Sequence, residues 1–301
     1  MHIRTAPKAP VSQNRRTFRI LMLHGYAQCS ERFQVKAQLV VKQITKDILP
    51  KIQYKFPDGL EFIFPDAPIQ FGGDDTSALE HRAWWLNLDD VSRYIGIETA
   101  ILSVPQLVDK RPIHAAIGFS QGGALAGMLA SLWEAAYNPQ RIQLLEAQGI
   151  PATQFLDCIP GQRPLHFIIA FAGYRGTMEY YSSFYTSSLF TPSLHVIGTL
   201  DTIVSEEQSH NLVHAFPNAE VLYYSGHHYI PRDPVLLKRV GYFVVNACSV
   251  LPQSEEETMY SRVTEGPISG GKTTTMSQIR EAMQKQVFNT CLLGALVSCC
   301  L

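Results

Sequence analysis

Short apolar runs alternate with stretches of helical periodicity along most of this chain. The apolar runs predict strands at about residues 18–23, 62–64, 113–117, 166–171, 194–197 and 220–224. Helical patterns cover about residues 31–47, 93–109, 124–134, 205–215 and 234–247. Strands that alternate with helices are typical of βα units around a parallel sheet. The pattern therefore predicts an α/β fold, with a mostly parallel sheet and helices on both of its faces.

The two ends of the chain differ from this central part. The first 30 residues contain basic side chains and no acidic one, and prolines interrupt any helix there. We therefore expect a disordered leader over residues 1–17 and a single domain over 18–250. Residues 251–301 are polar at first and apolar at the end, and we expect a poorly ordered tail. The proline-marked stretch at 137–163 is expected to be loosely structured.

The amino-acid composition excludes some classes of binding partner but does not identify one. The chain has 301 residues with 46% hydrophobic and 17% charged side chains, and its formal net charge is −1. This balance is ordinary for a globular protein and does not favour nucleic-acid binding. No apolar run is long enough to span a bilayer, so we expect no integral membrane segment. Six cysteines without a C-x-x-C pair or a secretory signal predict reduced thiols and a cytoplasmic location. The oligomeric state cannot be inferred.

A serine bracketed by glycines stands between a predicted buried strand and a predicted helix. Residues 118–122 have the sequence Gly-Phe-Ser-Gln-Gly, which is the pattern of a nucleophile elbow. In such an elbow the serine occupies a strained turn, and glycines on either side avoid steric clashes. The alternative is a glycine-rich turn with no catalytic role, but the strand and the helix that flank residues 118–122 favour the nucleophile elbow. Ser120 is therefore the candidate nucleophile.

A serine hydroxyl is a weak nucleophile until a base removes its proton, and the base needs a partner that fixes its tautomer. In α/β-hydrolases the chain order is serine, then an acid, then histidine. Asp201 follows one predicted strand, and His227 and His228 follow the next. These positions lie beyond the carboxyl ends of parallel strands, where such folds place active sites. We predict a triad of Ser120, Asp201 and His228, with turn or loop roles as the alternative for the last two.

An acyl-transfer site also needs donors for the developing oxyanion. In this fold one backbone amide comes from the residue after the nucleophile and another from a loop after an early strand. These rules select the amides of Gln121 and Tyr26. His24 precedes the same early loop and is predicted to be a structural hydrogen-bonding residue rather than a base.

At this point the chain resembles a known group, the FSH family of serine hydrolases within the α/β-hydrolase superfamily. The resemblance covers residues 18–248 and rests on six motifs in order: Leu23-His24-Gly25-Tyr26, Phe64-Pro65-Asp66-Ala67-Pro68, Arg82-Ala83-Trp84-Trp85, Gly118-Phe119-Ser120-Gln121-Gly122, Val196-Ile197-Gly198 with Asp201, and Gly226-His227-His228-Tyr229-Ile230-Pro231. The family usually has Gly-Gly-His-x-Val-Pro in the last motif. His228 matches the family's histidine, and His227 replaces the second glycine, so His227 stays open as an alternative base.

The resemblance implies hydrolysis of a carboxylic ester or thioester through an acyl-serine intermediate, without a metal or an organic cofactor. Fungal members include thioesterases that release acyl or polyketide chains in secondary metabolism, so the small-molecule substrate could be carrier-bound. A catalytically silent binding protein with the hydrolase fold is the alternative function.

Several other features could indicate a binding or catalytic site, but each also has an explanation as ordinary structure. Residues 266–273 match the phosphate-binding Walker A pattern but follow a polar segment, so we interpret them as part of the tail. His210 and His214 have a zinc-like spacing, although no third ligand is evident. Trp84 and Trp85 could line an acyl pocket or belong to the core. The tyrosine-rich segment 174–190 could form a lid or pack internally.

Overall fold

The computed structural model describes residues 16–71, 81–87, 93–176 and 179–249. Almost all of the expected leader, and the whole of the expected tail at 251–301, lie outside these residues. The boundaries proposed for the leader, the domain and the tail therefore stay predictions. Residues 16 and 17 are described, and the backbone N–H of Arg16 donates to Asp58 Oδ2 at 2.7 Å.

Six of the described strands form one sheet in the order β10-β9-β8-β7-β1-β2, and every neighbouring pair is parallel. These strands are β1 (Phe18–Leu23), β2 (Leu60–Ile63), β7 (Ala115–Phe119), β8 (Phe167–Phe171), β9 (Ser193–Gly198) and β10 (Ala219–Tyr224). The central strands β1, β7, β8 and β9 are buried throughout, as expected for a parallel sheet covered on both faces. The predicted α/β fold with a mostly parallel sheet is confirmed.

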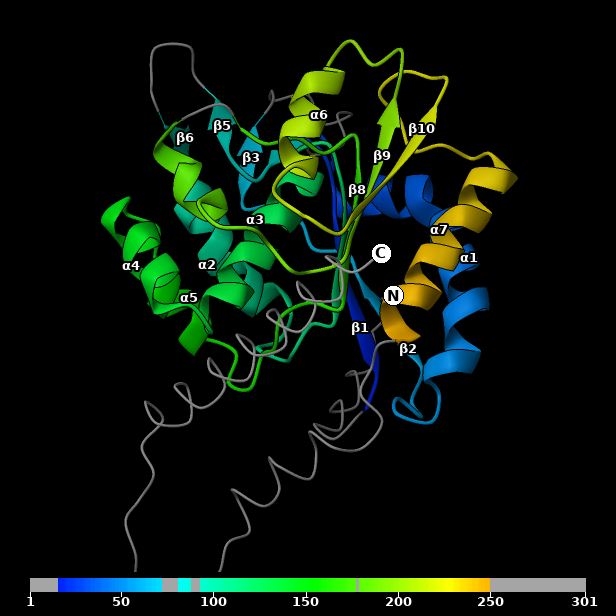
Figure 1. Cartoon of the computed structure of the whole chain (residues 1–301), viewed down its shortest axis with the longest axis horizontal. Helices are drawn as coiled ribbons and strands as arrows, with labels where there is room; N and C mark the ends of the chain where they lie inside the picture. The colour runs from blue at the N-terminus through cyan, green and yellow to red at the C-terminus, as the bar shows by residue number, and fades with distance from the viewer. Residues whose placement is uncertain (1–15, 72–80, 88–92, 177–178, 250–301) are drawn as a thin grey trace, which may run out of the picture. The chain divides into compact units, whose positions relative to one another are not determined.

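The helices lie on both faces of this sheet, as Figure 1 shows. They are α1 (Ser30–Ile52), α2 (Ile97–Leu107), α3 (Gln121–Ala135), α4 (Pro139–Ala147), α5 (Ala152–Asp157), α6 (Glu206–Val213) and α7 (Pro234–Ser249). Helices α1 and α7 pack together on one face, and α2 to α6 cover the other. Every residue of α3 is buried, so this helix is the centre of the larger core.

Two expectations about local structure were wrong. The stretch at 137–163 is not loose, because it contains α4 and α5. Asn138 caps α4 by accepting a hydrogen bond from Arg141 N, and Pro139 occupies its first turn. Both are recognised start signals for a helix, which the prolines of this stretch concealed.

The segment between β2 and α2 was predicted without strands and with a helix from about residue 93. It contains two antiparallel pairs of short strands, β3 (Ile69–Phe71) with β4 (His81–Ala83) and β5 (Leu86–Asn87) with β6 (Tyr94–Ile95). Strands of two or three residues show too little alternation to be recognised in a sequence. A short 3-10 helix, η1 (Glu179–Tyr185), was also not predicted.

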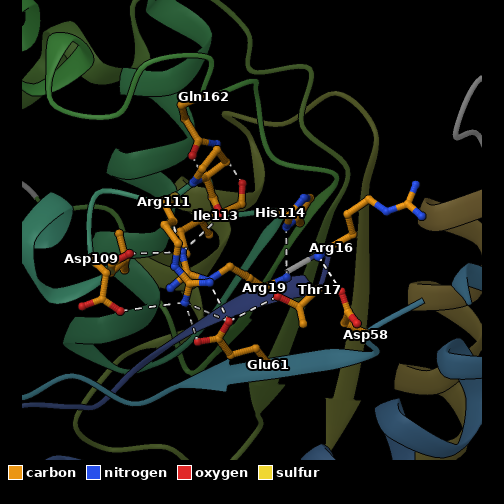
Figure 2. Close-up of polar contacts among 12 residues, drawn as sticks. Arg16, Thr17, Arg19, Asp58, Glu61, Asp109, Arg111, Ile113, His114 and Gln162 are labelled. Atoms are coloured by element: carbon orange, nitrogen blue, oxygen red, sulfur yellow. Dashed lines mark hydrogen bonds and ion pairs between the residues drawn. The ribbon is translucent and has the colours of Figure 1, made fainter. Parts of the chain in front are cut away.

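A charged cluster fastens the amino-terminal half of the sheet (Figure 2). Arg19 is 3% exposed, and its Nε donates to Glu61 Oε2 at 2.9 Å, linking β1 to β2. Its Nη1 donates to the carbonyls of Val108 and Arg111 at 3.1 and 2.9 Å. Because one buried guanidinium ties the strand pair to the segment after α2, the entry of the chain into β7 is fixed.

His195 lies on β9, and only 1% of the residue is exposed to solvent. Its Nε2 lies 3.0 Å from Ser193 Oγ, and no described residue pairs with Nδ1. Burial, with a smaller contribution from His210, lowers the pKa of His195 to about 3. The folded protein therefore holds this ring neutral at neutral pH.

This burial predicts a pH-dependent stability. Below about pH 6.5 the unfolded chain binds a proton at His195 that the folded state does not bind, so stability falls as the pH decreases. His195→Gln keeps an amide near the position of Nε2 and removes the titration. Between pH 6 and pH 4 the unfolding free energy of wild type should fall relative to His195→Gln by about 1.4 kcal/mol per pH unit. Urea unfolding at several pH values measures this difference.

His214→Gln is the matched control, because His214 is exposed. Its stability should run parallel to that of wild type over the same pH range. If the curves of wild type and His195→Gln were also parallel, the burial of His195 would not be the source of acid sensitivity.

Candidate active site

Ser120 occupies a strained turn between the end of β7 and the start of α3. Its backbone has φ 54° and ψ −119°, in a region that residues other than glycine rarely adopt. Its N–H donates to the carbonyl of Phe171 on β8 at 2.8 Å, and its carbonyl accepts from Ala124 N at 3.0 Å. The side chain is 8% exposed. The predicted nucleophile elbow is therefore present as a backbone conformation.

The two glycines of the elbow are required by backbone packing. A Cβ atom on Gly118 would overlap the carbonyl of Gly122, and one on Gly122 would overlap the carbonyl of Leu23 on β1. The obstacles are backbone atoms, which cannot move aside as a flexible side chain can. The strand, the turn and the helix can approach one another this closely only without side chains at 118 and 122.

Asp201 and His228 meet at the carboxyl ends of β9 and β10. His228 Nδ1 lies 2.7 Å from Asp201 Oδ2, and the side chains are 18% and 2% exposed. A carboxylate only accepts, so Nδ1 carries the shared proton, and Nε2 is the nitrogen left to act as a base. The other carboxylate oxygen, Oδ1, accepts from the backbone N–H of Ile203 and Val204 at 2.9 and 3.0 Å. The acid is therefore held on both of its oxygens.

The ring of His228 lies beside the residue that precedes the serine. Its centroid is 4.8 Å from that of Phe119, the last residue of β7. Within the described part of the chain the hydroxyl of Ser120 has no hydrogen-bond partner. Hydrogen bonds between nucleophile and base are often loose before substrate binds, so the lack of this bond is compatible with proton transfer in the substrate complex.

His227 has different surroundings from its neighbour. Its Nδ1 lies 2.8 Å from the carbonyl oxygen of Leu200, and the residue is exposed. None of the described carboxylates contacts its ring. Because only His228 has a carboxylate partner, the contacts favour His228 over His227 as the candidate base.

Tyr224 holds the loop that carries both histidines. Its hydroxyl lies 2.7 Å from the carbonyl of His227 and 2.6 Å from that of Tyr229. Burial raises the pKa of Tyr224 to about 12, and nearby Asp201 adds to the effect. The phenol therefore remains a donor at neutral pH. This role could not be recognised in the sequence.

The two backbone amides predicted to bind the oxyanion are those of Tyr26 and Gln121. Among the described residues, neither Tyr26 N nor Gln121 N donates a hydrogen bond. Gln121 is the first residue of α3, where the helix dipole also favours negative charge. Tyr26 follows β1 in a loop that pairs with β4 through Arg82 N and Gln28 O at 3.0 Å. Its side chain is 49% exposed and stacks on Phe71.

The side chain of Gln121 joins the elbow to the Trp84–Trp85 segment. Its Oε1 accepts from Trp84 N at 2.9 Å, and its Nε2 donates to Trp85 O at 2.8 Å. Both tryptophans are at most 1% exposed and belong to the hydrophobic core, which settles their open role in favour of packing. Sequence reasoning selected Gln121 only for its backbone and missed this bridge.

His24 is a structural residue, as predicted. It is fully buried, and its Nε2 accepts from Ala67 N at 3.0 Å while its carbonyl accepts from the Trp84 indole at 2.9 Å. Burial lowers the pKa of His24, so the ring is neutral. It joins the loop after β1 to the segment after β2.

The remaining candidates do not form a second site in the described residues. His210 bonds to the Tyr223 hydroxyl at 2.7 Å, and no group of side chains in the described ranges could hold a metal ion. In the tyrosine-rich segment Tyr181 is 2% exposed and stacks on Tyr94, so this part packs internally. Residues 266–273 lie outside the described residues. No described helix is both long enough and apolar enough to span a bilayer.

Three of the six cysteines belong to the described residues. Cys29, Cys158 and Cys248 are free. The other three cysteines fall in the part of the chain that the structure leaves undescribed.

The chain is similar to several known proteins. The sequence model of the family described as "Serine hydrolase (FSH1)" matches residues 13–240. "Esterase OVCA2" of Danio rerio is 30% identical over 238 residues, covering 71% of this chain and 90% of the relative. "Esterase OVCA2" of Xenopus tropicalis is 27% identical, covering 75% and 91%. Among solved structures, Zea mays acyl-protein thioesterase 2 is similar with a TM-score of 0.48 and 20% identity, covering 78% of this chain and 95% of that one.

The bridge made by Gln121 predicts a stability effect. Gln121→Leu would leave the buried N–H of Trp84 and the carbonyl of Trp85 without partners, at a cost of about 2–4 kcal/mol in unfolding free energy. Chemical denaturation measures this loss. Gln38→Leu is the control, because Gln38 is exposed on α1, and it should change stability by less than about 0.5 kcal/mol. Equal stability of the two variants would contradict the bridging role.

Proposed function

Because this chain belongs to the FSH family of serine hydrolases, we propose that it cleaves a carboxylic ester or thioester through an acyl-serine intermediate formed on Ser120. The observation that carries the proposal is the 2.7 Å contact between His228 and Asp201, beside a serine on a strained turn. A buried carboxylate that fixes the tautomer of an imidazole prepares that imidazole to act as a base.

In the first half of the reaction His228 Nε2 accepts the proton of the Ser120 hydroxyl as Oγ bonds to the acyl carbon. The carbonyl π electrons move to oxygen and give a tetrahedral oxyanion. As the oxyanion collapses, the bond from the acyl carbon to the alcohol or thiol breaks, and His228 gives its proton to this leaving group, so that the imidazole is neutral again. Asp201 stays ionised and stabilises the imidazolium.

In the second half water attacks the acyl-serine. His228 accepts a proton from the water, the acyl carbon–Oγ bond breaks, and the proton passes to Ser120. The products are a carboxylic acid and the original enzyme. The amides of Tyr26 and Gln121 are the donors that we assign to the oxyanion, and loss of one such donor typically costs about 10²–10³-fold in turnover.

Ser120→Ala should abolish labelling by a fluorophosphonate probe and reduce kcat on a p-nitrophenyl ester by about 10⁶-fold. Asp201→Asn retains the shape of the site but favours the wrong imidazole tautomer, with an expected loss of about 10⁴-fold. In-gel fluorescence and steady-state kinetics measure both effects. Ser225→Ala is the control, since this exposed serine lies in the loop that carries His228.

Undiminished labelling of Ser120→Ala would show that another residue is the nucleophile. Wild-type protein with neither labelling nor turnover would favour the alternative, a silent binding protein with the hydrolase fold.

Esters and thioesters, the two substrate classes of the proposal, differ in their leaving group, which is an alcohol or a thiol. We expect acyl-thioesters and oxygen esters of the same acyl chain to react at the same serine, because the attack geometry is shared. A thioesterase should show the higher kcat/KM on the thioester of each matched pair. Acyl and polyketide chains linked to a carrier extend the series and test a role in secondary metabolism. Loss of both activities together in Ser120→Ala is required, and an activity that survived would belong to another site.

A further inference from the structure

Two consecutive histidines of one loop contact two consecutive residues of the neighbouring loop. His228 Nδ1 lies 2.7 Å from Asp201 Oδ2, and His227 Nδ1 lies 2.8 Å from Leu200 O. A backbone hydrogen bond joins the same two loops, in which Leu200 N donates to Gly226 O at 3.0 Å. The two loops are therefore joined by a pair of ring contacts, of which only the contact of His228 includes a carboxylate.

The chemistry of the His227 contact fixes its direction. A carbonyl oxygen only accepts, so Nδ1 of His227 must carry a proton. That proton is present both in the neutral tautomer and in the imidazolium, and the bond is kept in either charge state. The ring is exposed, so the hydrophobic core does not depend on it.

The backbone of His227 is held independently of its ring. The Tyr224 hydroxyl lies 2.7 Å from the His227 carbonyl, so the loop after β10 is anchored to its own strand. The ring adds a second link to the other loop, beside the Leu200–Gly226 backbone bond, at the residue directly before Asp201. Displacement of Leu200 would move Asp201 away from His228.

We propose that His227 is a positioning residue, whose Nδ1–H holds Leu200 and so keeps Asp201 within hydrogen-bonding distance of His228. Its effect on turnover rests on the proposed function, whereas its effect on the Asp201–His228 contact does not. His227 itself contacts neither the serine nor the substrate in this role.

Three substitutions at position 227 distinguish the effect of the Nδ1 hydrogen-bond donor from the effect of the size of the ring. Asn places an amide N–H near the position of Nδ1, Gln places one near Nε2 instead, and Leu retains bulk without a donor. We expect His227→Gln and His227→Leu to lower kcat on a p-nitrophenyl ester about fivefold with KM unchanged, because one exposed hydrogen bond is lost. His227→Asn should stay close to wild type. Wild-type kcat in the Gln and Leu variants, or equal losses in all three, would overturn the proposal.

A second measurement needs no turnover. The Nδ1 proton that His228 shares with Asp201 should give a downfield proton NMR resonance, which Asp201→Asn removes and so assigns. This resonance should persist in wild type and His227→Asn and broaden by exchange with water in His227→Gln and His227→Leu. An equally sharp resonance in all four proteins would refute the positioning role. A wild type that shows the resonance but hydrolyses nothing would count against the proposed function alone.

Discussion

The close approach of three backbone segments at the elbow is the constraint on which the rest of the structure depends. Gly118 at the end of β7 faces Gly122 at the start of α3, and Gly122 lies against Leu23 at the end of β1. This contact places the serine above the centre of the sheet with a left-handed φ. The backbone strain is tolerated because α3 is buried along its whole length and has no other position to take.

The order of strands explains how the candidate residues are brought together. Strands β9 and β10 are neighbours, so Asp201 and His228 emerge side by side and can bond directly. Strand β8 separates β9 from β7, so the loop after β10 must extend across the sheet edge towards Ser120. The ring of His228 reaches Phe119, which shows that the loop spans this distance. The contacts of Tyr224 and His227 then hold the loop in place.

Several buried polar side chains of this protein have a structural role. His24, Gln121 and Arg19 connect segments far apart in the chain by hydrogen bonds to backbone groups. Burial keeps His24 and His195 neutral, which removes them from acid–base chemistry at neutral pH. An imidazole in this fold is thus a candidate base only where a carboxylate meets it, as at His228.

The sequence by itself determined the alternation of strands and helices, the elbow around Ser120 and the order of serine, acid and histidine, because each depends on a short local pattern. The tertiary structure decided that α4 and α5 form, that Trp84 and Trp85 are core residues, and that His228 rather than His227 meets a carboxylate. These outcomes rest on contacts between residues remote in the chain, such as Gln121 with Trp84 at a separation of 37 residues. A local pattern carries no information about such partners, since their distance is set only when the sheet and its helices have packed together.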